Sequence, residues 1–203
     1  MSNLEEEKME EILENQNDIK KVHRAKKMML WFGIVSLGMS FAGLTSAYVI
    51  SKERPDWLTD FVIPQSFYFS LIVIILSSIT IHFAKTSIVA KESKRGMILL
   101  IITFLLGISF TYLQFRGFSE IISNGYYFTG SESSITTSFI YLVVILHLTH
   151  IIFALISVLV VIYNHYKQKY ANGNTLGVEL ATTFWHFVDF LWIYLFLFFY
   201  FVR

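Results

Sequence analysis

The sequence predicts an all-α integral membrane bundle of five transmembrane helices. Apolar residues make up 55% of the 203 residues, and most of them are gathered in five long blocks. A helix needs about 20 mostly apolar residues to cross about 30 Å of hydrocarbon, so each block is long enough to span a bilayer. Together the blocks take up more than half of the chain, which leaves no room for a separate soluble domain. They cover residues 28–51, 67–86, 97–115, 135–163 and 178–202.

A charged tail, residues 1–27, precedes the first block, and residues 28–203 form the predicted transmembrane domain. Six glutamates lie in the first 14 residues of the tail, and five lysines and arginines lie between residues 20 and 27. A solvated acidic helix, a disordered arm and a docking arm for a neighbouring subunit all stay open for such a tail. The first block is too long for the core of a signal peptide, so we predict an uncleaved first span.

The first block also carries a stripe of small residues. Spacings of four, three and four residues place them on one face of a helix. Small residues let helix backbones approach closely in lipid, where no hydrophobic force drives helices together. The stripe therefore predicts a tight helix–helix contact. Its members are Ser36, Ser40, Gly43 and Ala47.

Basic residues predict the direction in which the chain is threaded. Lysines and arginines near the ends of spans favour the cytoplasmic side of a membrane. Eleven of them lie on the side of the N-terminal tail, and four lie on the other side. We therefore predict a cytoplasmic N-terminus and a C-terminus on the outside.

Ionisable side chains at membrane depth are costly unless they are paired or face an interior. His147 and His150 lie near the middle of the fourth block, three residues apart and thus on neighbouring sides of one face. His82 lies near the predicted cytoplasmic end of the second block, at the depth of the interface. The two histidines of the fourth block are therefore the more informative ones.

The fifth block carries a polar stripe. Its members follow spacings of three, four and three residues, which place them within a sector of roughly 80° of a helix. Trp185 and Trp192 flank the stripe, and we assign them to packing. The stripe consists of Glu179, Thr182, His186 and Asp189.

Three interpretations compete for His147, His150, His186 and Asp189. In the first, His186 and Asp189 satisfy each other in a hydrogen-bonded patch that locks the fourth and fifth helices together. The second is a proton relay, which His and carboxylate groups inside membranes often form. The third is a metal or b-type haem site with His ligands from two helices. The residues alone leave all three open.

The composition excludes several other kinds of protein. The chain has no cysteine, which excludes disulfides, thiolate-held zinc, iron–sulfur clusters and the attachment motif of a c-type haem. Its net charge is +1 and no segment forms a broad basic face, so no nucleic-acid partner is expected.

The string F-W-H-F-V-D-F-L-W at residues 184–192 closely resembles a signature in subunit III of haem-copper oxidases. That signature, W-H-F-V-D-x-x-W, stands in the last helix of the family, which also tends to have a Glu upstream, where this chain has Glu179. The pair His147-x-x-His150 is similar to an H-G-x-H stretch in the preceding family helix.

The resemblance covers residues from about 28 to 203 in order. Leu113-Gln114, at the end of the third block, looks like the L-Q that closes the corresponding family helix. Long members of the family have seven spans, and five spans resemble the short bacterial form that lacks the first two. Two buried acidic residues of the family are absent, because Leu37 follows Ser36 and Gly117 stands three positions after Gln114.

This resemblance implies a non-catalytic core subunit III of a proton-pumping terminal oxidase, which reduces O₂ to water in the bacterial cytoplasmic (inner) membrane. It implies no catalytic residue, no metal and no haem in this chain, with haems and copper in partner subunits and a bound phospholipid. Subunit I would be the main partner, followed by subunit II, small subunits and a respiratory supercomplex. The electron donor, cytochrome c or quinol, would dock on another subunit.

In that context, a polar network would support proton uptake and the stability of subunit I. Its expected members are Glu179, His186, Asp189, His147 and His150. Two other classes of protein stay open. One is a membrane haem-b protein that uses His147, His150 and His186. The other, a small transporter, is weaker, since the sequence shows no internal repeat and no Pro inside a block.

Overall fold

The computed structural model describes residues 3–54, 57, 63–128, 134–170 and 175–202, with side chains from residue 8 onward. Five α-helices account for most of these residues, and all five are long and apolar enough to cross a membrane. The predicted all-α class with five spans is confirmed, while the direction of threading stays a prediction. The helices are α1 (Asn3–Ser51), α2 (Gln65–Val89), α3 (Ser93–Ser123), α4 (Ile135–Tyr166) and α5 (Leu176–Val202).

The chain divides into two compact units, Met1–Leu37 and Gly38–Arg203. In the first unit the acidic tail belongs to α1, which is helical from Asn3 onward. An exposed ion pair joins Lys21 Nζ to Asp18 Oδ1 at 2.9 Å. The tail is therefore helical, and its role as a docking arm for a neighbouring subunit stays a prediction.

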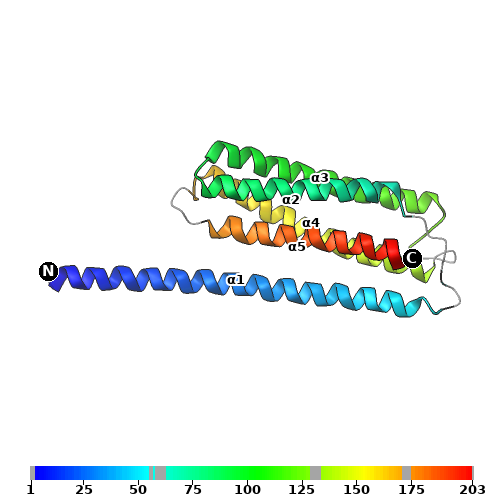
Figure 1. Ribbon diagram of the computed structural model, residues 1–203, viewed down its shortest axis with the longest axis horizontal. Helices are drawn as coiled ribbons and strands as arrows, with labels where there is room; N and C mark the ends of the chain where they lie inside the picture. The colour runs from blue at the N-terminus through cyan, green and yellow to red at the C-terminus, as the bar shows by residue number, and fades with distance from the viewer. Residues whose placement is uncertain (1–2, 55–56, 58–62, 129–133, 171–174, 203) are drawn as a thin grey trace. The chain divides into compact units, whose positions relative to one another are not determined.

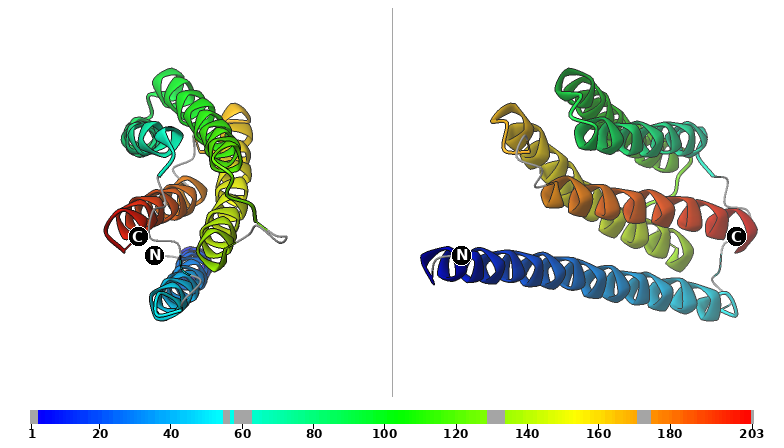
Figure 2. Two further views of the ribbon diagram at one scale, coloured as in Figure 1. Left: turned by 90° about the vertical axis from the view of Figure 1, so that its right-hand side faces the viewer. Right: turned by 60° about the vertical axis from the view of Figure 1, so that its left-hand side comes forward.

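The second unit contains the end of α1 and the whole of α2–α5. Helix α3 packs against α2 and α4, and α5 packs against the same two helices, so the four form a closed ring. Figures 1 and 2 show these four helices running alongside one another. In this arrangement the α2–α5 edge lies opposite the α3–α4 edge.

Local sequence explains where these helices begin and end. Ser134 and Thr137 form a capping box at the start of α4, in which each side chain accepts a hydrogen bond from the other residue's backbone N–H. Two connections turn through residues with positive φ, Lys91 after α2 and Gln168 after α4. In both, paired backbone hydrogen bonds close the last turn of the helix. The helices run beyond the predicted blocks, because a helix can continue into the polar interface where apolar residues stop.

The core of the second unit lies among α2–α5 and the last turns of α1. Phe41, Thr45 and Tyr48 are buried on α1, and the Thr45 hydroxyl lies 3.0 Å from the Tyr194 hydroxyl of α5. The small-residue stripe does not make this contact, since Ser40 and Gly43 are exposed. Within the second unit, therefore, bulky residues of α1 make the contact, and the stripe stays a predicted interface.

Candidate functional site

A cluster of polar side chains lies where α2 meets α5. We call this cluster the α2–α5 seam, and it consists of Ser77, Ser78, His82, Trp185, His186 and Asp189. Ser77 and Ser78 were not among the residues singled out from the sequence. Two adjacent hydroxyls inside an apolar block are the signal that could have identified them.

Trp185 anchors the buried side of the seam. Its indole Nε1 donates a hydrogen bond to Ser77 Oγ at 3.2 Å, and Ser77 Oγ donates to the Ile74 carbonyl at 2.8 Å. The far edge of the indole packs on α3 at Gly107, where an added Cβ would lie 2.7 Å from Trp185 Cη2. Gly107 thus leaves the room that the indole needs to reach across the bundle.

His186 points from α5 to α2. Its Nδ1 shares a hydrogen bond of 2.7 Å with Ser78 Oγ. The ring centre lies 6.1 Å from that of His82, which is exposed on α2. His186 is itself only half-buried, about ten residues or ~15 Å from the start of α5. An ionisable ring is therefore partly exposed deep inside the predicted span.

Asp189 lies one turn further along α5 and is buried, with 2% of its surface exposed. Neither carboxyl oxygen has a hydrogen-bond partner among the described residues. The Ser78 side chain lies beside this carboxyl. The expected pairing of Asp189 with His186 is absent from the described part of the chain, because the imidazole bonds Ser78 instead.

Glu179 and Thr182 occupy the first turns of α5. Glu179 Oε1 accepts a hydrogen bond from the Thr175 hydroxyl at 3.3 Å. Thr182 is buried, and its hydroxyl has no partner among the described residues. The stripe therefore has two sides. Glu179 and His186 are half-buried, whereas Thr182 and Asp189 are buried.

His147 lies elsewhere, in an aromatic cluster of the core. It is fully buried, stacked on Trp192 with ring centres 5.1 Å apart, and flanked by the edges of Phe41 and Phe110. Within the described residues, neither ring nitrogen has a hydrogen-bond partner. Packing on all sides leaves His147 without room for a haem plane.

His150 lies one helical turn after His147. Its Nδ1 forms a hydrogen bond of 2.7 Å with the carbonyl oxygen of Leu146 on the same helix. His147, His150 and His186 therefore do not converge on one point. Across the described residues, no group of three or more His, Asp or Glu side chains is arranged to hold a metal ion.

Further polar contacts join α2 to α3, and two of them involve large side chains of α3. Gln114, fully buried, donates from Nε2 to Ser70 Oγ at 3.0 Å. Nearer the C-terminal end of α3, the Glu120 carboxylate accepts hydrogen bonds from the Ser66 hydroxyl and, at 3.4 Å, from the Ser66 backbone N–H. The sequence pattern gives no sign of this role for Glu120, because its partner Ser66 is 54 residues away along the chain.

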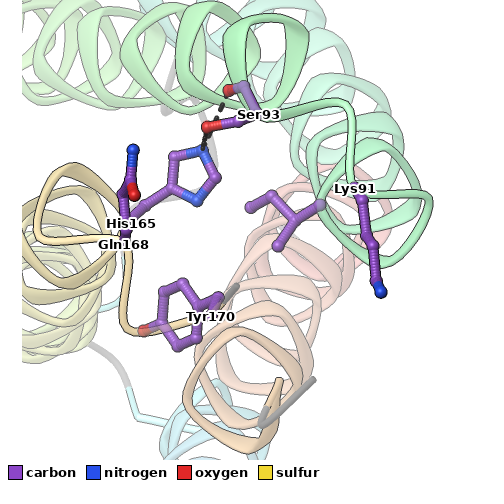
Figure 3. A pocket seen from close by; sticks show the side chains of 6 residues that line it. Lys91, Ser93, His165, Gln168 and Tyr170 are labelled. Atoms are coloured by element: carbon purple, nitrogen blue, oxygen red, sulfur yellow. Dashed lines mark hydrogen bonds between the residues drawn. The ribbon is translucent and has the colours of Figure 1, made fainter. Parts of the chain in front are cut away.

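A small cavity of about 210 Å³ opens at the end of the bundle that holds the α2–α3 and α4–α5 connections. His165 and Tyr170 line it, and His165 Nε2 lies 2.9 Å from the Ser93 carbonyl oxygen (Figure 3). Burial raises the pKa of the Tyr170 hydroxyl. Figure 3 shows the Lys91 side chain directed away from His165, so this cavity gathers no cluster of charge.

Comparison with known proteins gives a consistent result along the chain. The family model for cytochrome c oxidase subunit III matches residues 17–203. A Buchnera aphidicola subsp. Acyrthosiphon pisum protein named cytochrome bo(3) ubiquinol oxidase subunit 3 is 27% identical over 190 residues, which is 92% of this chain and 91% of that protein.

Proteins named cytochrome c oxidase subunit 3 are similar over a shorter stretch. The Loxodonta africana protein is 34% identical over 128 residues, 62% of this chain and 46% of that protein. The Bos taurus protein is 31% identical over 127 residues, 61% of this chain and 45% of that protein. The match thus spans about half the length of these relatives and most of the Buchnera protein.

Proposed function

The chain belongs to the cytochrome c oxidase subunit III family, and from this premise we propose that it is the non-catalytic subunit III of a proton-pumping terminal oxidase. In this proposal the chain holds no redox centre, and the haems and copper belong to partner subunits. It lies in a bacterial cytoplasmic membrane, packs mainly against subunit I, and binds phospholipid. Its task is to support proton uptake and the stability of subunit I.

The α2–α5 seam is the observation that supports this proposal most directly. It carries the tryptophan, histidine and aspartate of the family-like string on one wall and Ser77 and Ser78 on the other. His82 is exposed and His186 half-exposed within helices that span the membrane. Because ionisable groups facing lipid are costly, we propose that other oxidase subunits cover this edge.

The small-residue stripe supports a second contact with partners. Ser40 and Gly43 are exposed on α1, and a Cβ added at Gly43 would meet nothing within 4 Å. Small residues are typical of close helix contacts in membranes. We assign this face to a helix of a partner subunit.

Purification of a tagged chain from its native membranes in mild detergent tests the proposal. We expect haem-bearing oxidase subunits to co-purify and the preparation to consume O₂ with either reduced cytochrome c or a quinol. Assaying the two donors side by side identifies the oxidase type. Isolation of the chain alone, carrying stoichiometric haem, would instead support the membrane haem-b alternative.

A further inference from the structure

The charged tail at the start of α1 carries an apolar face. Its positions follow spacings of three, four, three and four residues, so they lie on one side of the helix. Met9, Ile12 and Ile19 on this side are each about half exposed. We call this side the tail face, and it consists of Met9, Ile12, Gln16, Ile19 and His23.

The same spacing forms a packed face further along α1. Phe41, Leu44 and Tyr48 lie three and four residues apart, and Phe41 and Tyr48 are at most 1% exposed within the second unit. The tail thus repeats the residue pattern with which α1 packs against other helices.

The charges of the tail are sorted around the tail face. Lys20 and Lys26 lie along its two edges, at the end near the predicted span. The tail face is therefore apolar at its outer end and bordered by positive charge near the membrane. The acidic residues from position 8 onward lie on the far side of the helix, exposed to water, and they are Glu10, Glu11, Glu14 and Asp18.

The membrane surface does not cover the tail face. Helix α1 runs without interruption from Asn3 to Ser51 (Figure 1). It contains no Pro or Gly before Gly33, so it lacks the residues that usually kink a helix. At 1.5 Å per residue, Met9 stands about 28 Å beyond Met28, the first residue of the predicted span. The headgroups of the bilayer therefore lie too far away to bury it.

A second copy of this chain is a poor occupant of the tail face. Two copies in one membrane run parallel, which sets Lys20 and Lys26 of each copy at the same level, with helix axes about 8–10 Å apart. Charges along the edges of a helix pair select the partner, and like charges there reject it. The occupant that fits carries acidic side chains at this level.

We propose that the tail face binds an amphipathic helix of a partner chain outside the membrane. This helix sets apolar residues, three and four positions apart, against Met9, Ile12 and Ile19, and acidic residues against Lys20 and Lys26. Gln16, in the middle, pairs with a polar side chain and fixes the register, as buried polar residues do in coiled coils.

This contact goes beyond the proposed function. The family match begins at residue 17, so Met9, Ile12 and Gln16 lie outside the part of the chain that the family model covers.

The first test locates the partner helix by photo-crosslinking. The chain has no cysteine of its own, so Ile12→Cys on the tail face and Glu14→Cys on the far side can each carry a benzophenone maleimide. The complex is purified from native membranes in mild detergent and irradiated, and peptides joined to the introduced cysteine are identified by mass spectrometry. We expect Ile12→Cys to join a different chain, at a segment with apolar residues three and four apart and Asp or Glu at its end near the membrane.

Glu14→Cys is the matched control and should give at least tenfold less of this product. Equal yields from the two positions, no protein product from Ile12→Cys, or a product with a second copy of this chain would each overturn the proposal. If the wild-type chain purifies without oxidase subunits, the proposed function fails, yet the cross-linked peptide still decides what the tail face binds.

The second test weakens the contact. Gln forms helices at least as well as Ile, so Ile12→Gln/Ile19→Gln keeps the tail helical while removing its apolar side chains. We expect the partner found by cross-linking to bind about 100-fold more weakly, at about tenfold for each buried apolar side chain. Glu14→Gln/Lys21→Gln, on the far side, should retain it.

The two lysines have a separate signature. Lys20→Gln/Lys26→Gln should lower the KCl concentration at which the partner dissociates, because salt screens exposed ion pairs. The amount of the chain in the membrane is checked on a gel for every variant. Full retention of the partner by both double variants would overturn the proposal.

Discussion

The Asp189 carboxyl is buried on α5, and neither of its oxygens has a hydrogen-bond partner among the described residues. Replacing it with an amide therefore removes no hydrogen bond, and Asp189→Asn should leave the subunit fully retained in the complex. If the carboxyl serves proton supply, as we propose, the variant complex should slow at alkaline pH, where proton delivery limits turnover. Oxygen consumption measured against pH, on complexes checked for subunit content, tests this.

Thr182→Val is the matched control for Asp189→Asn. Thr182 is buried on the same helix, and its hydroxyl also lacks a partner among the described residues, so Thr182→Val removes a buried polar group that is not a carboxyl. We expect Thr182→Val to behave as the wild type at every pH. An Asp189→Asn complex with a wild-type pH profile would remove Asp189 from any account of proton supply.

Gly107 sets how closely α3 approaches the Trp185 indole. A Cβ there would lie 2.7 Å from Trp185 Cη2 and 2.8 Å from Leu155 Cδ2. Overpacking of this kind costs about 1–3 kcal/mol, which exceeds the ~1 kcal/mol that alanine gains over glycine in a helix. Gly107→Ala should therefore lower the free energy of unfolding of the chain in detergent, measured by titration with a denaturing detergent.

Gly38 offers the comparison for Gly107, because a Cβ added there would meet nothing within 4 Å. Gly38→Ala should be neutral or stabilise the chain by up to ~1 kcal/mol. Equal effects at the two positions would mean that the close packing between α3 and Trp185 contributes no stability.

At the scale of single helices, the N-terminus of α2 is held by a residue of α3. Pro64 precedes α2 and its side chain makes no capping hydrogen bond, while the Glu120 carboxylate accepts from both the hydroxyl and the backbone N–H of Ser66. A carboxylate at a helix N-terminus also interacts favourably with the helix dipole.

Glu120→Gln should therefore loosen the first turn of α2 at a cost of about 1 kcal/mol. Faster hydrogen exchange at the amides of Ser66 and Phe67 would show it. Ser119→Ala is the control, because the Ser119 hydroxyl donates to its own helix, at the Phe115 carbonyl. Unchanged exchange in Glu120→Gln would show that α2 needs no cap from α3.

Sequence patterns predict these helices better than they predict the contacts among them. Apolar length alone identifies five spans, since the hydrocarbon thickness sets the number of residues. The 3.6-residue period places His186 and Asp189 on one face, yet it cannot show that Ser78 of α2 lies within reach of His186. Likewise the sequence shows that Gly117 stands where the resemblance expects an acidic residue. The structure adds that the Phe67 ring occupies the space that a side chain at position 117 would need.

For the whole molecule, the direction of threading is open to a direct test. The chain has no cysteine, so a single introduced cysteine is the one thiol of the chain that a labelling reagent can modify. Glu92 and Asn124 are exposed at opposite ends of α3. The excess of basic residues on the N-terminal side predicts that Glu92→Cys reacts with an impermeant thiol reagent only from the cytoplasm, and Asn124→Cys only from outside. The opposite labelling pattern would mean that the bundle lies in the membrane with its N-terminus outside.

The central claim is that this chain supports an oxidase whose redox centres lie in other subunits. Depleting the chain from the purified complex, then recording the haem spectrum and the time course of O₂ consumption, tests it most directly. We predict an unchanged haem content per remaining complex, normal initial turnover at neutral pH, and activity that declines during turnover. Loss of haem together with the chain, or a time course identical to that of the intact complex, would contradict the account.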